Sequence, residues 1–590
     1  MKTPISPKVV LLGLVISTFS ITGCTKEKPK KTPPKNPPVK PQRPAREPSM
    51  KEKTQKEAKA FLDAYFTDLE KLEKQQTTAY WKAANSGKKE DFAAFEKADL
   101  ALKTLRSSTD RFKTIKTLLG KKQHLDPLTV RALEVAHLSF KANQLPKEVL
   151  SQLVKASTEI ERTFSTFRGK IGKKKFSNNK LLAMLSKSRN SRKRRRAWLA
   201  LKQVGDAVGP KIIALAKLRN EAAKKLGYKN FWEMKIRLQE HDPKKILSLF
   251  EELAKLTEKP FKEMKVKLDR ELARKFRTRP ARLRPWHYDN PFFQAPPPSA
   301  KVDLDVFYKE KKKEEIVEIA KTFFSDIGLP VEDILKRSDL YEREGKNQHA
   351  FCIAIDREGD VRTLVNIKPT SKWMDTLLHE LGHALYYKHM NFELPYNLRD
   401  AAHILTTEGV AMLFGALAKN PQWLIGYAKS NPKKVKKLDS AILEQRRREQ
   451  LIFTRWTLVM LHFEKALYEN PDADLNKLWW DMVEKYQGLT RPKGRNAADW
   501  ASKPHFTIAP VYYHNYMMGE LFAAQLRATL AKKANHEGPS SKLSFTNRKD
   551  FGEYLKDKVF KPGMRKPWPV FVKESTGAPL TAKFFAAELK

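Results

Sequence analysis

Two histidines and a glutamate within five residues are the part of this sequence best suited to catalysis: His379-Glu380-Leu381-Gly382-His383. On a helix, a spacing of four residues places His379 and His383 on one face, where both imidazoles reach a single metal ion. Glu380 lies one residue further round and can contact a water held by that ion. This pattern is typical of zinc hydrolases. The alternative is a pair of core histidines that bind no metal.

The residues around this pentapeptide predict the helix that the pattern requires. Thr370-Ser371 follows Pro369 and offers a helix N-cap. Apolar residues then recur at helical spacing. They are Trp373, Leu377, Leu378, Leu381 and Leu385.

A zinc site of this kind needs a third protein ligand, and the downstream sequence offers Glu393, His403 and Glu408. Glu408 stands alone in the apolar segment 400–418, which predicts a second helix. A buried carboxylate is costly unless a cation lies beside it, so Glu408 is the favoured ligand. His403 and Glu393 remain alternatives.

Two runs rich in β-branched residues precede the predicted metal-binding helix. Residues 349–355 and 361–367 flank the turn sequence 356–360 and predict a β-hairpin. An exposed edge of this hairpin could pair with the backbone of a bound peptide. Alternatively, the hairpin is structural and its edge is covered.

A second cluster of polar and aromatic residues lies between Lys503 and Tyr516. Its lysine, histidines and tyrosines are suited to holding carboxylates and oxyanions. Spacing alone, however, favours solvated or packed side chains at these positions.

These motifs together resemble the peptidyl-dipeptidase A family, the zinc peptidases that include angiotensin-converting enzyme, in a bacterial form. The resemblance covers most of residues 50–590. The matching stretches are AWLALKQVG, LAKLRNEAAKKLGY, QHA, HELGHALYY, TTEG, LWWDMVEKYQG, and KPHF through Tyr516. The resemblance implies a mainly α-helical, two-lobed gluzincin-type peptidase with a deep channel. It also implies a small hairpin beside the metal-binding helix.

The resemblance further implies a role for each site residue. One Zn²⁺ would be bound by His379, His383 and Glu408, with Glu380 as the general base. The other roles concern the substrate. His505 and Tyr516 would stabilise the tetrahedral intermediate, Lys503 and Tyr513 would bind the substrate's C-terminal carboxylate, and His349 and Ala350 would bind the peptide near the cleaved bond.

The sequence departs from the family pattern at two kinds of position. Asn515 and Val483 stand where the animal enzymes carry chloride-binding arginines, so the resemblance does not extend to chloride binding. The glutamine that joins the carboxylate-binding group has no clear match. The nearest segment, 284–289, offers Tyr288 or His287 instead.

The N-terminus predicts export. Residues 1–23 combine an early lysine with the apolar run VVLLGLVI, and Cys24 follows. This resembles a bacterial lipoprotein signal, which implies a lipid on Cys24 and a membrane-anchored location. An ordinary signal peptide with an incidental cysteine is the alternative. Residues 24–50 are rich in proline and lysine and predict an extended tether, followed by a single peptidase domain over 51–590.

The amino-acid composition bears on two further questions, whether the protein binds nucleic acid and whether it contains a disulfide. The chain has 115 Lys and Arg against 67 Asp and Glu, a formal net charge of +48. The densest basic run is 189–196, but charge elsewhere is dispersed among acids, so we expect a solvated face and no nucleic-acid partner. Once Cys24 is set aside, Cys352 is the only cysteine, which leaves no intramolecular disulfide. Long helices are expected in segments 50–77, 90–119, 192–226, 243–275, 303–327 and 433–468.

The sequence thus predicts a monomeric zinc dipeptidyl carboxypeptidase that releases C-terminal dipeptides from oligopeptides in the cell envelope. One alternative is an endo-acting or single-residue zinc oligopeptidase of related fold. The other is a non-catalytic, basic envelope-binding or nucleic-acid-binding protein.

Overall fold

The computed structural model describes residues 48–297 and 302–589. The described part is mainly α-helical, as expected, with two small antiparallel hairpins. The expected signal segment and lipidation site, and all but the last residues of the tether, lie outside the described residues. Within the described residues, no helix is both long and apolar enough to cross a membrane.

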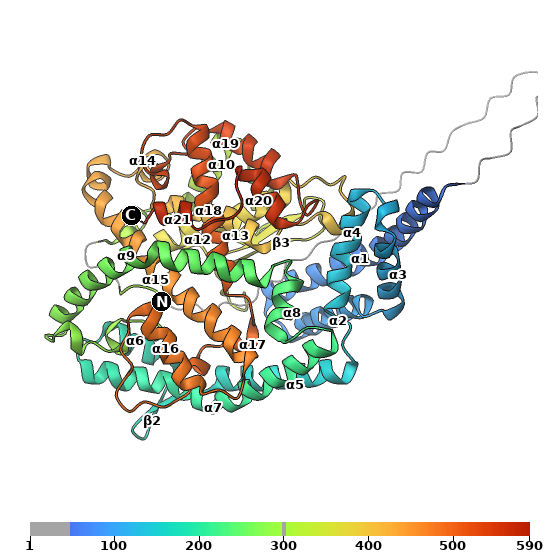
Figure 1. Cartoon of the computed structure of the whole chain (residues 1–590). Helices are drawn as coiled ribbons and strands as arrows, with labels where there is room; N and C mark the ends of the chain where they lie inside the picture. The colour runs from blue at the N-terminus through green and yellow to red at the C-terminus, as the bar shows by residue number, and fades with distance from the viewer. Residues whose placement is uncertain (1–47, 298–301, 590) are drawn as a thin grey trace, which may run out of the picture.

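Figure 1 shows two large groups of helices with the long α9 (Pro243–Lys275) running between them, and a smaller N-terminal group at one end. The N-terminal group is α1 (Met50–Ser86), α2 (Lys89–Arg106), α3 (Thr109–Gly120) and α4 (Pro127–Lys141). The lower group in this view is α5 (Lys147–Thr166), α6 (Asn178–Lys187), α7 (Ser191–Lys225), α8 (Phe231–Leu238), α16 (Leu475–Gln487) and α17 (His505–Ile508).

The upper group holds the predicted metal-binding helices. It comprises α10 (Lys313–Asp326), α12 (Ser371–Lys388), α13 (Ile404–Gly415), α14 (Pro421–Gly426), α18 (His514–Lys533), α19 (Lys549–Leu555), α20 (Trp568–Thr576) and α21 (Lys583–Ala587). The long α15 (Pro432–Glu469) connects α14 to the lower group.

Most of the long helices form where the sequence predicts them, and the exceptions have local causes. The predicted helix 90–119 is divided in two, because the Ser108 side chain caps a new helix by accepting from the Arg111 N–H. The predicted helix 303–327 is α10 preceded by a short turn, Leu304–Phe307. The helix predicted over 400–418 begins only at Ile404, because the His403 ring accepts from the Leu405 N–H as its N-cap.

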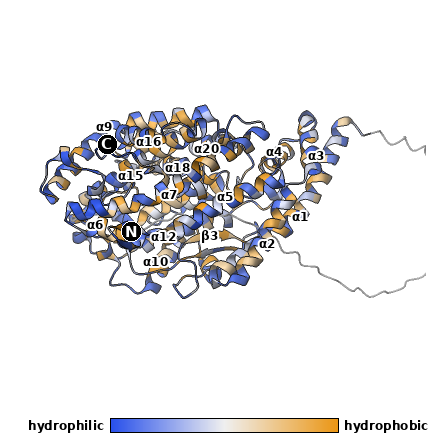
Figure 2. Ribbon diagram, turned by 90° about the horizontal axis from the view of Figure 1, so that it is seen from below, coloured by the Kyte–Doolittle hydropathy of each residue, from blue (hydrophilic) through white to orange (hydrophobic). Residues whose placement is uncertain are grey.

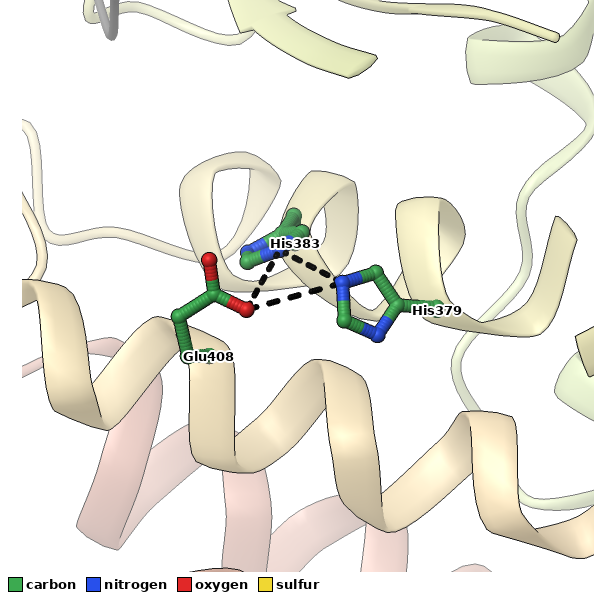
Figure 3. Close-up of side chains that lie close together, drawn as sticks. All are labelled: His379, His383 and Glu408. Atoms are coloured by element: carbon green, nitrogen blue, oxygen red, sulfur yellow. Dashed lines mark hydrogen bonds and ion pairs between the residues drawn. The ribbon is translucent and has the colours of Figure 1, made fainter. Parts of the chain in front are cut away.

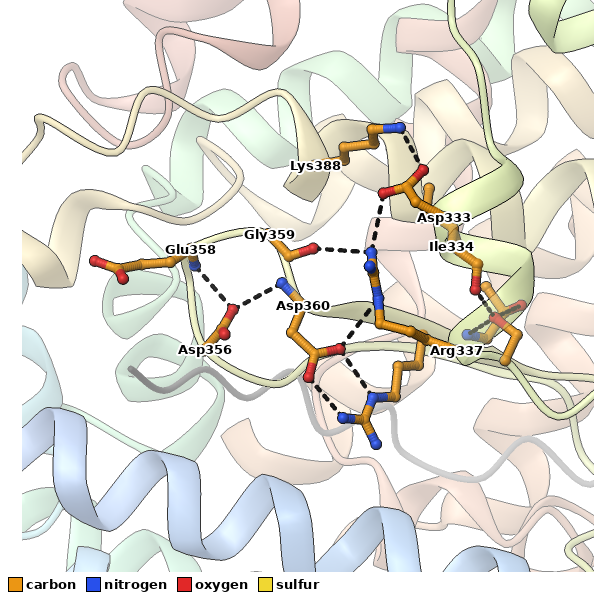
Figure 4. Close-up of polar contacts among 11 residues, drawn as sticks. Asp333, Ile334, Arg337, Asp356, Glu358, Gly359, Asp360 and Lys388 are labelled. Carbon is orange, nitrogen blue, oxygen red and sulfur yellow. Dashed lines mark hydrogen bonds and ion pairs between the residues drawn. The ribbon is translucent and has the colours of Figure 1, made fainter. Parts of the chain in front are cut away.

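The small hairpin beside α12 consists of β3 (Phe351–Ala354) and β4 (Val361–Leu364). Asp356 fixes its turn by accepting from the backbone N–H groups of Glu358 and Asp360 (Figure 4). The outer edge of β4 is covered, because Asp339 forms a parallel bridge with it. Within the described residues, β3 pairs with β4 alone. The short α11 (Glu332–Arg337) packs against β4, and a second hairpin joins β1 (Gly169–Ile171) to β2 (Lys174–Phe176).

Figure 2 shows hydrophilic and hydrophobic residues interspersed along most of the helices. In the densest basic run, Arg192, Lys193, Arg195 and Arg196 are exposed, whereas Arg194 is buried and pairs with Asp289. The expectation of a solvated face is therefore wrong for Arg194, whose role is structural.

One buried carboxylate, Glu73 of α1, makes several polar contacts between the N-terminal helices and the body. Its side chain is 2 % exposed and accepts from Arg106, from the Tyr396 hydroxyl, and from Arg357 in the turn of the β3–β4 hairpin. Two guanidinium groups therefore depend on this one acid for their nearest negative charge.

We expect Glu73→Ala to lower the free energy of unfolding by about 2–4 kcal/mol, because it leaves the buried Arg357 guanidinium with only the more distant Asp400 as a paired acid. Glu57→Ala is the matched control on the same helix, since Glu57 forms only an exposed pair with Lys121 and should change stability by less than about 1 kcal/mol. Chemical denaturation measures both. Equal losses in the two variants would contradict this role for Glu73.

Candidate active site

The two histidines of the pentapeptide and Glu408 meet at one point between α12 and α13, as Figure 3 shows. The Nε2 atoms of His379 and His383 lie 3.2 Å apart. Glu408 Oε2 lies 3.6 Å from His379 Nε2 and 3.8 Å from His383 Nε2. Of the three candidate third ligands, the structure therefore selects Glu408.

This spacing fits a tetrahedral zinc ion. With zinc–nitrogen and zinc–oxygen bonds of about 2.0–2.2 Å, two ligands of a tetrahedral ion stand about 3.3–3.5 Å apart. The observed separations are within a few tenths of an ångström of that value. Two imidazoles and one carboxylate are also the donor set of many catalytic zinc sites, which keep a fourth position for water.

Close helix packing brings Glu408 to the histidines. A Cβ atom on Gly382 of α12 would lie 2.9 Å from the Ala411 Cα of α13, and one on Gly409 would lie 2.6 Å from Phe522 of α18. Only glycine allows these approaches. Thr407, one residue before Glu408, contacts His383 Nδ1 through its hydroxyl at 2.7 Å and so fixes the ring orientation.

Glu380, the predicted general base, follows His379 directly in α12. Its side chain comes from the same turn of α12 as His379 and is buried. Its Oε2 atom is buried and has no hydrogen-bond partner among the residues that the structure describes. A buried carboxylate oxygen is rarely left unsatisfied, so an additional polar group at the site, such as water, fits this arrangement.

The two rejected ligand candidates have other surroundings. Glu393 is exposed in the loop after α12. His403 caps α13, and its Nε2 lies 2.9 Å from the backbone oxygen of Gln239. Neither belongs to the group of ligand atoms formed by His379, His383 and Glu408.

Lys503 and Tyr513 come together as predicted, and a glutamine joins them. Lys503 Nζ lies 5.3 Å from the centre of the Tyr513 ring and donates to Gln294 Oε1 at 2.7 Å. Lys503 is buried, and this burial lowers its pKa to about 7. A lysine, an amide and a phenol in one place provide donors for a carboxylate.

His505, Tyr513 and Tyr516 form a connected group. The His505 ring lies 5.1 Å from the Tyr513 ring, which lies 5.4 Å from the Tyr516 ring. Burial, reinforced by the charge of Lys503, lowers the pKa of His505 to about 2, so its imidazole is neutral. Both of its ring nitrogens lack a hydrogen-bond partner among the described residues.

The tyrosines also lie near the metal ligands. The pKa values of Tyr516 and Tyr512 are raised, mainly because both side chains are buried and in second place because the Glu408 charge lies near them. Both hydroxyls therefore keep their protons at neutral pH and are hydrogen-bond donors. Tyr512 and Tyr516 thus contribute neutral hydroxyl groups near the Glu408 carboxylate.

Comparison with known proteins agrees with this geometry. A sequence model of the Peptidase_M2 family, described as angiotensin-converting enzyme, matches residues 52–584. The chain belongs to the angiotensin-converting enzyme family.

Individual relatives in this family are distant. The angiotensin-converting enzyme of Mesocricetus auratus is 26 % identical over 269 residues, which are 44 % of this chain and 20 % of that protein. The angiotensin-converting enzyme-like protein Ace3 of Mus musculus is 24 % identical over 293 residues, 48 % of this chain and 39 % of its own length. The enzyme of Theromyzon tessulatum is 22 % identical over 289 residues, 47 % of this chain and 46 % of that protein. The chain therefore spans less than half the length of these relatives.

Gln294 is a residue near Lys503 that sequence reasoning missed. Gln294 contacts Lys503, whereas His287 contacts Ser191 and Tyr288 donates to Asp269. Gln294 follows the irregular sequence Asn290–Phe293, where no periodicity or spacing indicates a site. Thr407 and Tyr512 were also missed, although both adjoin residues that were predicted.

His349, Ala350, Val483 and Asn515 were also singled out from the sequence. His349 is exposed and Ala350 is half-buried immediately before β3, whose one strand partner in the described part of the chain is β4. At the positions of the family's chloride-binding arginines, Val483 is buried and Asn515 donates to the Gln239 side chain at 2.7 Å. Neither residue brings a positive charge.

We expect Glu408→Gln to weaken zinc affinity about 100-fold or more while the protein stays folded, because a neutral amide replaces an anionic ligand. Glu393→Gln makes the same change on the exposed, rejected candidate and should leave affinity unchanged. Competition against a chromogenic chelator measures both. Equal affinity in the two variants would contradict the ligand assignment.

Proposed function

We propose that this protein is a zinc-dependent dipeptidyl carboxypeptidase that releases C-terminal dipeptides from oligopeptides. The observation that carries the proposal is the cluster of His379, His383 and Glu408, in which His383 and Glu408 are buried and to which the buried Glu380 is adjacent in sequence. Membership of the angiotensin-converting enzyme family supports the same reaction. Zinc at this cluster supplies a Lewis acid that acidifies water and polarises a carbonyl group.

The residues of the chain perform the remaining steps. Glu380 accepts a proton from the attacking water and passes it to the leaving amine, which is general base and then general acid catalysis. His505 and Tyr516 donate hydrogen bonds to the negative charge that develops on the carbonyl oxygen. Donors of this kind contribute about 3 kcal/mol each to transition-state stabilisation.

Lys503, Gln294 and Tyr513 would hold the free carboxylate of the substrate. A carboxylate held at a fixed place relative to the metal lets one peptide bond reach it, which explains release of a unit of fixed length. The backbone of Ala350 and the imidazole of His349 would align the peptide, because β3 has no second strand partner among the described residues.

The location is also a proposal, and it rests on the sequence. We propose that residues 1–23 are a lipoprotein signal, that Cys24 carries a lipid, and that residues 24–50 tether a monomeric enzyme to the cell envelope. The basic tether would add electrostatic attraction to anionic lipid head groups.

Glu380→Gln should keep its zinc and lose about 1,000-fold or more in kcat/KM on a mixed oligopeptide pool, because the amide cannot accept the proton. Zinc content by mass spectrometry and product analysis by peptide mass spectrometry test this together. Wild-type turnover in the zinc-loaded variant would rule out Glu380 as the base.

The lowered pKa of Lys503 predicts a pH dependence of substrate binding. Lys503 carries its charge below its pKa of about 7, so KM for a peptide with a free C-terminus should rise about tenfold per pH unit above that value. The same peptide with a C-terminal amide should bind weakly at every pH.

Lys503→Met should remove the pH dependence, whereas Lys346→Met, at another buried lysine that pairs with Asp339, should keep it. Internal cleavage of the amidated peptide at an undiminished rate would instead favour the endo-acting alternative.

A further inference from the structure

The turn between α17 and α18 contains a strained residue, Val511. Its φ angle is 53°, in the left-handed region, and its side chain is 2 % exposed. A β-branched residue rarely adopts this conformation, which costs about 1–3 kcal/mol and persists only where the surroundings enforce it. The next residues along the chain are Tyr512 and Tyr513, and α18 begins at His514.

Two side chains from elsewhere in the chain, the buried Glu464 and the half-buried Gln239, hydrogen-bond both backbone polar groups of Val511. The Val511 N–H donates to Glu464 Oε1 of α15 at 2.8 Å. The Val511 carbonyl accepts from Gln239 Nε2, at the end of α8, at 3.0 Å. Since a hydrogen bond on each side fixes the orientation of the backbone, the two contacts together select the left-handed conformation.

Glu464 has no role in the proposed chemistry, although it is a buried acid. Its residue is 4 % exposed, and burial raises its pKa to about 8 while Arg219 and Lys235 partly oppose the shift. A buried carboxyl group is costly and calls for a reason. The hydrogen bond that Glu464 accepts from the Val511 N–H supplies such a reason.

The other end of the same segment is anchored in a similar way. Arg219 of α7 donates to the backbone oxygens of Phe506 and Thr507 at 2.6 and 2.8 Å. Polar side chains from α7, from α15 and from Gln239, the residue after α8, therefore hold the backbone that carries His505, Tyr513 and Tyr516.

We propose that Glu464 and Gln239 are positioning residues that hold Val511 in its strained conformation and thereby aim Tyr513 and Tyr516 into the active site. Without them, Val511 relaxes to a negative φ and α18 begins with its tyrosines misdirected. This inference rests on the proposed peptidase activity, but it concerns the backbone turn and not the metal.

The test combines loss of the anchor with relief of the strain. Glu464→Met keeps the side-chain volume and removes the acceptor, so kcat/KM for a free-carboxylate peptide should fall about tenfold or more. Val511→Gly alone should stay near wild-type activity, because glycine adopts positive φ without cost. The double variant Glu464→Met with Val511→Gly should recover most of the lost activity. Glu464→Gln keeps an acceptor oxygen and should stay near wild type.

A merely structural Glu464 predicts a different pattern, since glycine at position 511 would not repair lost packing. No recovery in the double variant, or wild-type kcat/KM in Glu464→Met, would overturn the proposal. Hydrogen exchange gives an independent readout: the Val511 amide should exchange about tenfold or more faster in Glu464→Met, and unchanged exchange would also overturn it. A wild-type protein with no peptidase activity would refute the proposed function, whereas the exchange result tests the anchor separately.

Discussion

A carboxylate with a 2 % exposed side chain, Glu408, faces two imidazoles on the neighbouring helix, and the upper half of the molecule is arranged around that contact. An acid in this position loses most of its hydration and requires positive charge nearby. A divalent cation held by Glu408 and the two histidines would supply that charge. The helices must approach unusually closely for the three side chains to reach one ion, and glycines at the contacts of α12, α13 and α18 allow it.

The site is polar but incompletely satisfied within the protein. Glu380 Oε2 and both ring nitrogens of His505 are buried without hydrogen-bond partners among the described residues, and Lys503 is buried with a lowered pKa. Such groups reduce stability and are retained where they meet substrate or reacting atoms. The surrounding structure holds these groups in place: Thr407 contacts the His383 ring, and the turn at Val511 is hydrogen-bonded on both sides. Hydrogen-bond donors that are already oriented need not reorganise when negative charge develops in the transition state.

Sequence patterns predicted those features of the structure that depend on a short stretch of the chain. The α12 helix and its cap follow from Thr370 and the apolar spacing, and the metal pair follows from two histidines one turn apart. Glu408 was preferred over His403 and Glu393 because of its apolar surroundings, which is a burial argument that needs no coordinates. The mainly α-helical fold followed from the family resemblance and the long helical segments.

The features that were missed or misplaced depend on contacts between distant parts of the chain. Gln294 lies in irregular structure and acquires its role only when Lys503 folds against it. The late start of α13 depends on the cap provided by the His403 side chain. Glu464 and Val511 are 47 residues apart, and positive φ at a valine has no signature in sequence.

The central claim is that one zinc ion is bound by two imidazoles and one carboxylate. X-ray absorption spectroscopy at the zinc K edge of the purified protein tests it most directly. The account predicts one zinc per chain with four nitrogen or oxygen ligands at about 2.0–2.1 Å, two of them with the outer-shell scattering of imidazole. A protein that does not retain zinc, or a first shell containing sulfur or lacking imidazole, would contradict it.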